Sequence, residues 1–136
     1  MNLLITDIDG TLAIDGWRAN IQDFDERQRA ASEDKANTIM IAMLASLAEC
    51  SWQVVGLTSR NERWRLQTNK WLGKQEVPFD EMYMRKNDDF AGAAEFKVLS
   101  VKRLLAQMAP THVLLIDSRE DVIAAYKAEG WSTLQP

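Results

Sequence analysis

The sequence predicts an α/β protein whose central sheet is parallel and covered by helices on both faces. Along the 136 residues, short apolar runs of strand length alternate with longer segments in which apolar residues recur at helical spacing. The apolar runs show no alternation of polar and apolar residues, which is typical of strands buried on both faces of a sheet. These observations favour a Rossmann-like three-layer sandwich with about five strands.

The first half of the chain accounts for two strands and two helices. Residues 2–6 form an apolar run of strand length. From residue 36 to residue 50, apolar residues recur every three or four positions, which predicts an amphipathic helix. Residues 52–57 (WQVVGL) predict the second strand, and Thr58 and Ser59 then lead into the next helix. We expect that helix to end at Gly73, because glycine is frequent just past a helix C-terminus.

The second half repeats the same alternation. Residues 79–84 predict a third strand, and a polar loop separates it from a helix over residues 95–108. Residues 112–116 (HVLLI) predict a fourth buried strand that ends at Asp117. A helix with Val122, Ile123 and Tyr126 on its inner face and a terminal strand at residues 131–134 complete the expected fold.

Residues 12–35 interrupt this pattern, because they are polar, mixed in charge and only weakly periodic. We expect a surface insertion with one short helix, a rudimentary cap too short to form a large cap domain. The rest of the chain contains no repeat and no linker between domains, so residues 1–136 are expected to form a single domain.

The composition excludes several classes of function. The formal net charge of -4 does not favour wholesale attraction to nucleic acid or to an anionic membrane, although a local basic patch is compatible with it. Cys50 is the only cysteine, so the chain has no internal disulfide, and we expect its side chain to be buried. Without a basic leader or an apolar stretch of ~20 residues, we expect a cytoplasmic protein with no membrane association and no obligate protein partner.

The ends of the predicted strands carry residues suited to phosphate chemistry. In a doubly wound sheet, ligands bind beyond the carboxyl ends of the strands, so residues that follow different strands meet at one edge. In chain order these residues are Asp7, Asp9, Thr58, Ser59, Arg85, Lys86 and Asp117, with Lys97 near the start of a helix that returns to the same edge.

The three acids at this edge indicate a magnesium site. Asp7 and Asp9 are two positions apart in an extended segment, so their side chains point the same way. Together with Asp117 they would repel one another unless a cation were present, and Mg²⁺ takes oxygen ligands. The cation, Lys97 and the amides of the Gly10 turn could hold a phosphate group. One carboxylate is then free to act as a nucleophile and the other as a general acid and base.

Four features follow one another along the chain: the motif DIDGT at residues 7–11, Thr58, Lys97 and the acid that closes the fourth strand. Together and in this order, they resemble the motifs of the haloacid dehalogenase (HAD) superfamily of phosphatases. The resemblance implies that Asp7 is the nucleophile that forms an aspartyl-phosphate. It implies that Asp9 protonates the leaving group and then activates water. Thr58 would hold the phosphoryl group, and Lys97 would bridge it to Asp7.

The same resemblance implies a Mg²⁺ site made by Asp7, the main-chain carbonyl of Asp9, and Asp117. Asp121 creates the D-x-x-x-D spacing found in other HAD members and could support this site. In the motif itself, Gly10 would let the backbone turn under the phosphate, and Thr11 would fix that turn.

A narrower resemblance concerns the 3′-phosphatase domain of bacteriophage-type polynucleotide kinase. It rests on Arg18, on the T-S-R at 58–60, on the W-L at 71–72, on the M-R at 84–85 before a D-D loop, and on the I-D-S-R at 116–119. It implies that Arg18, Arg60 and Arg85 contact the substrate, with Ser59 beside them. Because the chain has no GxxxxGK[ST] kinase loop, only phosphatase activity is expected.

The chain departs from that family pattern in two places. Ser118 stands where the family usually has a second acid, and Ala91 and Ala93 stand where it commonly has Arg and Asp. The expected substrate is a phosphomonoester, either a nucleic-acid 3′-phosphate end or a nucleotide or other small phosphate. In an open site of this kind, Trp17 of the insertion is a candidate for stacking on a base.

Two other classes of protein remain as alternatives. A response-regulator receiver also gathers acids, a Thr and a Lys, but its phosphorylated Asp closes the third strand, where this chain has Met-Arg-Lys at residues 84–86. A phosphatase-like binding or regulatory module with little turnover is the second alternative, suggested by Ser118 and Ala93.

Overall fold

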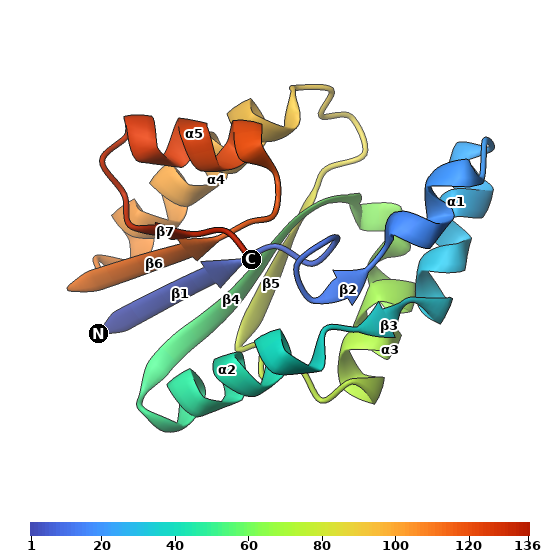
Figure 1. Cartoon of the computed structure of the whole chain (residues 1–136). Helices are drawn as coiled ribbons and strands as arrows, with labels where there is room; N and C mark the ends of the chain where they lie inside the picture. Colours follow the sequence, from blue (N-terminus) through green and yellow to red (C-terminus); the bar gives the residue numbers. More distant parts are fainter.

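The computed structural model describes all 136 residues and places a five-stranded sheet at the centre of the molecule (Figure 1). Its strands lie in the order β5-β4-β1-β6-β7, and every neighbouring pair is parallel. The strands are β1 (Asn2–Thr6), β4 (Trp52–Asn61), β5 (Glu81–Arg85), β6 (His112–Ile116) and β7 (Thr133–Leu134). Counted along the chain, this is the 3-2-1-4-5 order of a Rossmann-like sheet, which confirms the predicted fold and differs from the 2-1-3-4-5 order of receivers.

Helices cover both faces of the sheet, as the sequence predicts. On one face lie α4 (Ala93–Met108) and α5 (Glu120–Ala128), and on the other lie α2 (Thr38–Glu49) and α3 (Arg65–Lys74). Leu3 and Ile5 of β1 pack in the core cluster that includes Val101 of α4, whereas Leu4 packs in the cluster that includes Leu44 of α2. Successive residues of β1 therefore serve opposite cores, which explains why its sequence shows no polar alternation.

The segment between β1 and α2 is more structured than a surface insertion with one helix. Strands β2 (Ala13–Ile14) and β3 (Lys35–Ala36) pair antiparallel and close the segment at its base. Between them lie α1 (Phe24–Ala30) and 3-10 turns at Gly16–Asn20 and Ala31–Glu33. Figure 1 shows this unit beside the ends of β1 and β4, and it is the only addition to the sandwich, so there is no large cap.

The structure corrects the predicted course of the chain after Thr58. Thr58 and Ser59 do not lead directly into a helix, because β4 continues to Asn61 with an irregular register against β5 between Thr58 and Asn61. A 3-10 turn at Glu62–Trp64 then precedes α3. The irregular end of the strand keeps Thr58 and Ser59 in extended backbone at the sheet edge.

Two further predictions need correction. Gly73 lies inside α3 and not beyond its end, since the left-handed residue after the helix is Glu76, with a φ of 55°. Cys50 is exposed at the end of α2. The remaining elements match their predicted ranges to within one or two residues at each end, with β5 beginning at Glu81 and β7 at Thr133. No helix combines the length and the apolar character that crossing a membrane requires.

Candidate active site

Two buried acids and a buried lysine meet where β1 and β6 end. Asp7 follows β1 and Asp117 follows β6, and because these strands are parallel neighbours the two residues emerge side by side. Lys97, in the second turn of α4, reaches back to them: its Nζ lies 2.8 Å from Asp7 Oδ1 and also donates to Asp117 Oδ2. The structure thus brings together three residues that the sequence analysis assigned to the site.

The charges of this cluster do not cancel. Burial raises the pKa of Asp7 to about 7, and the neighbouring Asp117 adds to that rise while Lys97 opposes it. Burial alone would lower the pKa of Lys97, but the two carboxylates outweigh it and raise that pKa. One ammonium group serves two carboxylates, so the site is short of positive charge.

Asp9 lies beside this cluster and is held by two arginines. Arg60 donates two hydrogen bonds to the Asp9 carboxylate, from Nε to Oδ2 at 2.9 Å and from Nη2 to Oδ1 at 2.7 Å. Arg18 Nη2 donates to Oδ1 at 2.7 Å. Burial would raise the pKa of Asp9, but the hydrogen bonds and charges of Arg60 and Arg18 reverse this and lower it. Arg60 also donates through Nη1 to Thr68 Oγ1 of α3, at 3.1 Å.

Asp34, which the sequence analysis did not select, completes this network from the insertion. Its carboxylate accepts from Arg18 Nε at 2.8 Å, from Arg18 Nη2 at 2.6 Å and from Trp17 Nε1 at 2.8 Å. Its main-chain carbonyl accepts from Trp71 Nε1 of α3 at 2.9 Å. The buried Asp34 side chain therefore holds Arg18 against Asp9, and its main-chain contact with Trp71 links the insertion to the core. Asp34 also binds the indole N–H of Trp17, the residue that the sequence analysis named as a candidate for stacking on a base.

The turn of the DIDGT motif depends on Gly10 and Ser118. Gly10 adopts a φ of 77°, a conformation that favours glycine, and a Cβ there would lie 2.6 Å from Ser118 Oγ. Ser118 Oγ also donates to the main-chain oxygen of Asp9 at 3.2 Å, so this serine packs against the turn. The Thr11 side chain is buried beside this turn, and its Oγ1 makes no hydrogen bond to it.

The other predicted site residues are spread around this centre. Thr58 is buried and its Oγ1 accepts from the Arg60 amide at 3.2 Å, while Ser59 Oγ is buried without a partner. Arg85 donates to the Ala91 carbonyl at 2.8 Å, outside the acid cluster. Asp121 is exposed and pairs with Arg119 at 2.8 Å, so the structure does not bring it to Asp7 and Asp117.

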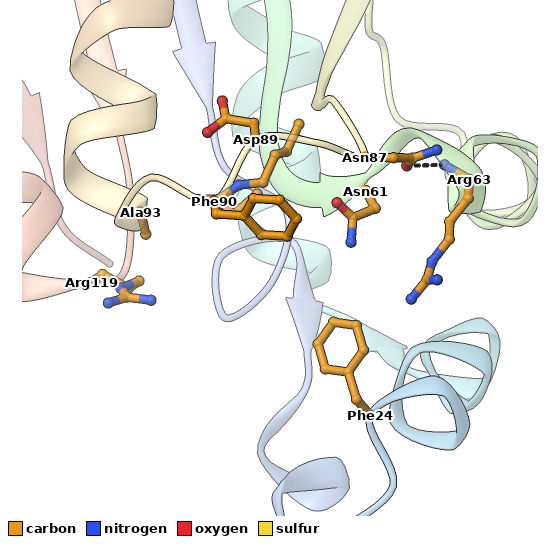
Figure 2. Close-up of a pocket in the computed structure, with 10 residues that line it drawn as sticks. Phe24, Asn61, Arg63, Asn87, Asp89, Phe90, Ala93 and Arg119 are labelled. Atoms are coloured by element: carbon orange, nitrogen blue, oxygen red, sulfur yellow. Dashed lines mark hydrogen bonds between the residues drawn. The ribbon is translucent and has the colours of Figure 1, made fainter.

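A polar cavity of about 260 Å³ opens over these groups. It has no apolar lining residue and is bounded by Asp7, Asp9, Gly10, Asp15, Ser59, Lys97, Ser118 and Arg119. Ser59 and Arg119 also line a larger groove of about 670 Å³, shown in Figure 2. A phosphate group in the cavity would meet the Lys97 ammonium and both acids of the DIDGT motif.

The donors present fit Mg²⁺, although the side chains alone do not form a complete metal site. No group of three or more Asp, Glu, His or Cys side chains is arranged to hold a metal ion. Mg²⁺ usually takes only one or two carboxylates and completes its shell with water and phosphate oxygens. The carboxylates of Asp7 and Asp117 and the carbonyl of Asp9 supply such oxygens at a place that lacks positive charge.

A Rossmann-like parallel sheet with a DxDGT turn after its central strand and a buried Lys–Asp pair beside it defines the class: a HAD superfamily phosphatase, which is a phosphoric monoester hydrolase. Within this class, the family model of the polynucleotide kinase PNKP phosphatase domain matches residues 1–136, and the chain belongs to that family. HAD members generally depend on Mg²⁺.

Solved structures carry the same fold. A chain of the Pnkp1/Rnl/Hen1 complex superposes with a TM-score of 0.81 and 24% identity, over 99% of this chain and 45% of that chain. A second structure, of the Pnkp1/Rnl/Hen1 RNA repair complex, gives a TM-score of 0.80 and 24% identity over 99% and 42% of the two chains. This chain thus spans less than half the length of those relatives.

A hydrolase from Streptococcus pneumoniae TIGR4 matches over 98% of this chain and 91% of its own, with a TM-score of 0.69 and 15% identity. No curated protein matches the chain at a significant level. At these sequence identities the structural matches show the fold alone, whereas the family model shows the family to which the chain belongs.

Proposed function

We propose that this chain is a Mg²⁺-dependent polynucleotide 3′-phosphatase that acts through an aspartyl-phosphate on Asp7. The observation that carries the proposal is the buried arrangement of Asp7, Lys97 and Asp117 beneath a polar cavity that Asp9 also lines. It occurs in a chain of the PNKP phosphatase family, which supports a nucleic-acid end as the substrate.

The proposed reaction has two steps. In the first, a carboxylate oxygen of Asp7 attacks phosphorus, the bond between phosphorus and the ribose O3′ breaks, and Asp9 gives a proton to O3′. In the second, water attacks the phosphorus of the aspartyl-phosphate and gives a proton to Asp9. The bond to Asp7 breaks, and inorganic phosphate leaves. Mg²⁺ held by Asp7, Asp117 and the Asp9 carbonyl would supply positive charge next to the phosphate oxygens.

We assign Arg18 and Arg60 to positioning Asp9. Both guanidinium groups bind the Asp9 carboxylate, and both side chains are buried. Their contacts lower the pKa of Asp9, which favours the ionised form that takes the proton from water in the second step and opposes the protonated form that the first step uses. Lys97 remains beside Asp7 throughout and offsets charge on the phosphoryl oxygens.

An open site supports a bulky substrate. Residues 12–35 act, in this proposal, as a rudimentary cap on a single domain, since the insertion folds beside the cavity and contributes only Asp15 to its lining. The likeness to Pnkp1 of an RNA repair complex also favours nucleic-acid ends. The same openness admits a nucleotide, which is the alternative substrate.

A substrate panel tests the proposal. Phosphate release with Mg²⁺ is compared for a 3′-phosphorylated oligonucleotide, 3′- and 5′-mononucleotides, sugar phosphates and p-nitrophenyl phosphate. We expect the highest kcat/KM for the oligonucleotide and no release by Asp7→Asn. Glu49→Gln is the matched control, because Glu49 is exposed at the far end of α2.

The panel can contradict the proposal in two ways. A preference for mononucleotides would replace the polynucleotide substrate by a nucleotide. Full activity in Asp7→Asn would exclude the aspartyl-phosphate route, and a folded wild-type chain that releases phosphate from none of these substrates would leave a binding module.

A further inference from the structure

The groove next to the cavity has two aromatic walls. Phe24, at the start of α1, and Phe90, in the loop between β5 and α4, both line it. Phe24 is 51% exposed and Phe90 is 89% exposed, although apolar rings of this size are usually buried. Figure 2 shows both rings among the residues that line the groove. Two exposed rings gathered at one opening indicate a ligand surface, whereas a single exposed residue would need no explanation.

Three arginines line the same groove. Arg63, Arg85 and Arg119 belong to its lining, against one acid, Asp89. The Arg85 guanidinium lies over the Phe96 ring and donates to the Ala91 carbonyl. Arg63 and Arg119 each pair with an acid outside the lining at 2.8 Å, and these pairs are about half exposed. Exposed ion pairs of this kind stabilise little, so both arginines can turn to an anionic ligand at small cost.

The residues that line the groove also carry polar groups. Ser59 Oγ and Arg85 Nε are buried without a partner in two of these residues. The side-chain amides of Asn61 and Asn87 belong to the same lining, and Asn87 Oδ1 accepts from the Arg63 amide at 3.2 Å, as Figure 2 shows. Buried polar atoms are rarely left unpaired, so Ser59 Oγ and Arg85 Nε point to a polar ligand alongside the rings.

We propose that the groove binds the unpaired bases at the 3′ end of a single strand, with a base stacked on Phe24 and Phe90 and the backbone phosphates held by the surrounding arginines. The inference rests on the proposed function and names the form of its substrate. Ser59 and Arg119 line both the groove and the cavity, so a strand in the groove is continuous with a terminal phosphate over Asp7. Base stacking on an aromatic ring tolerates any base but requires that the base be free of its duplex partner.

A comparison of two 3′-phosphorylated oligonucleotides tests this inference. One carries all its bases, and the other lacks the bases of its last two nucleotides. For the wild type, we expect kcat/KM to be roughly five- to a hundredfold higher for the strand with bases, the range that stacking of one base supplies. This ratio should fall towards one in Phe90→Ala and in Phe24→Ala. It should persist in the control Ile39→Ala, which truncates an apolar residue 81% exposed outside the groove.

The outcomes separate the inference from the proposed function. If the wild type hydrolyses both strands with equal kcat/KM, the 3′-phosphatase stands and the stacking site is refuted. A ratio that survives in both phenylalanine variants, with folding confirmed by thermal unfolding, also refutes it. If neither strand is hydrolysed, the proposed function fails. The stacking site is then tested by fluorescence anisotropy, which gives the ratio of the Kd values of the two strands when each carries a fluorescent label. A Kd ratio near one would then overturn the stacking site, whereas a ratio lost in Phe90→Ala would support it.

Discussion

Lys97→Met removes the ammonium group that lies between the carboxylates of Asp7 and Asp117. All three side chains are at least 94% buried, with exposures of 2%, 6% and 1% in that order. Breaking a buried ion pair by removing one partner typically costs about 3–5 kcal/mol, because the remaining charge is left buried and uncompensated. Here the ammonium serves two acids, so its loss should force a further carboxyl group to take up a proton.

That proton uptake sets the size of the effect. Protonating a carboxyl group of ordinary pKa 3.8 costs 1.36 kcal/mol for each pH unit above that value, or about 4 kcal/mol at pH 7 and about 1.6 kcal/mol at pH 5. In the variant the pKa of the folded carboxyl group is raised above its unfolded value, so folding takes up a proton. The loss of stability is therefore greatest at high pH and shrinks as the pH falls towards the unfolded pKa. We expect Lys97→Met to lose about 3–4 kcal/mol at pH 7 and less than half of that at pH 5.

Urea unfolding followed by tryptophan fluorescence, in buffer with a metal chelator, measures this loss at both pH values. The matched control is Lys102→Met in the same helix, because Lys102 pairs with Glu129 at 3.1 Å and both side chains are substantially exposed. An exposed pair contributes under about 1 kcal/mol, so the control should change little at either pH. A Lys97→Met loss no larger than that of the control, or one equal at pH 5 and pH 7, would refute the reasoning.

Two further predictions concern stability. Gly56→Ala in β4 should cost about 1–3 kcal/mol in urea unfolding, because its Cβ would lie 2.4 Å from the Phe79 ring in a closely packed core. Gly73→Ala, which meets nothing within 4 Å inside α3, should instead stabilise by up to about 1 kcal/mol, and equal effects at the two glycines would contradict this account. Asp34→Ala should cost about 3 kcal/mol because it leaves the buried Arg18 with Asp9 alone, and thermal unfolding that matches the wild type would show that the network adds no stability.

Much of the fold follows from patterns within short stretches of sequence. The apolar run at residues 2–6 predicts β1, and the run at 112–116 predicts β6, each with the bounds that the structure has. Parallel strands in an alternating α/β chain end at one edge, so Asp7 and Asp117 could be placed together without coordinates. Lys97 was assigned through the order of the motifs, and the structure brings its Nζ to both acids.

The elements that were misjudged depend on contacts made outside their own segment. The end of β4 is irregular because its last residues pair with β5 out of register. The T-S-R sequence carries no pattern that predicts this shift in register. The contacts of Arg18 and Arg60 with Asp9 were not foreseen either, and their contact with a substrate stays a prediction. Asp34 had no sequence signal at all, since an acid in a polar segment is ordinarily on the surface.

The sequence by itself determined the class of the fold, the strand ends that carry the reacting groups and the phosphoryl chemistry, because periodicity and strand-end motifs are local properties of the chain. Only the tertiary structure decided what surrounds those groups. Asp9 and Arg60 are 51 positions apart, and they meet because the fold brings the end of β4 beside the turn after β1. Phe24 of α1 and Phe90 of the loop before α4 likewise line one groove, and such long-range partners depend on packing that no local pattern encodes.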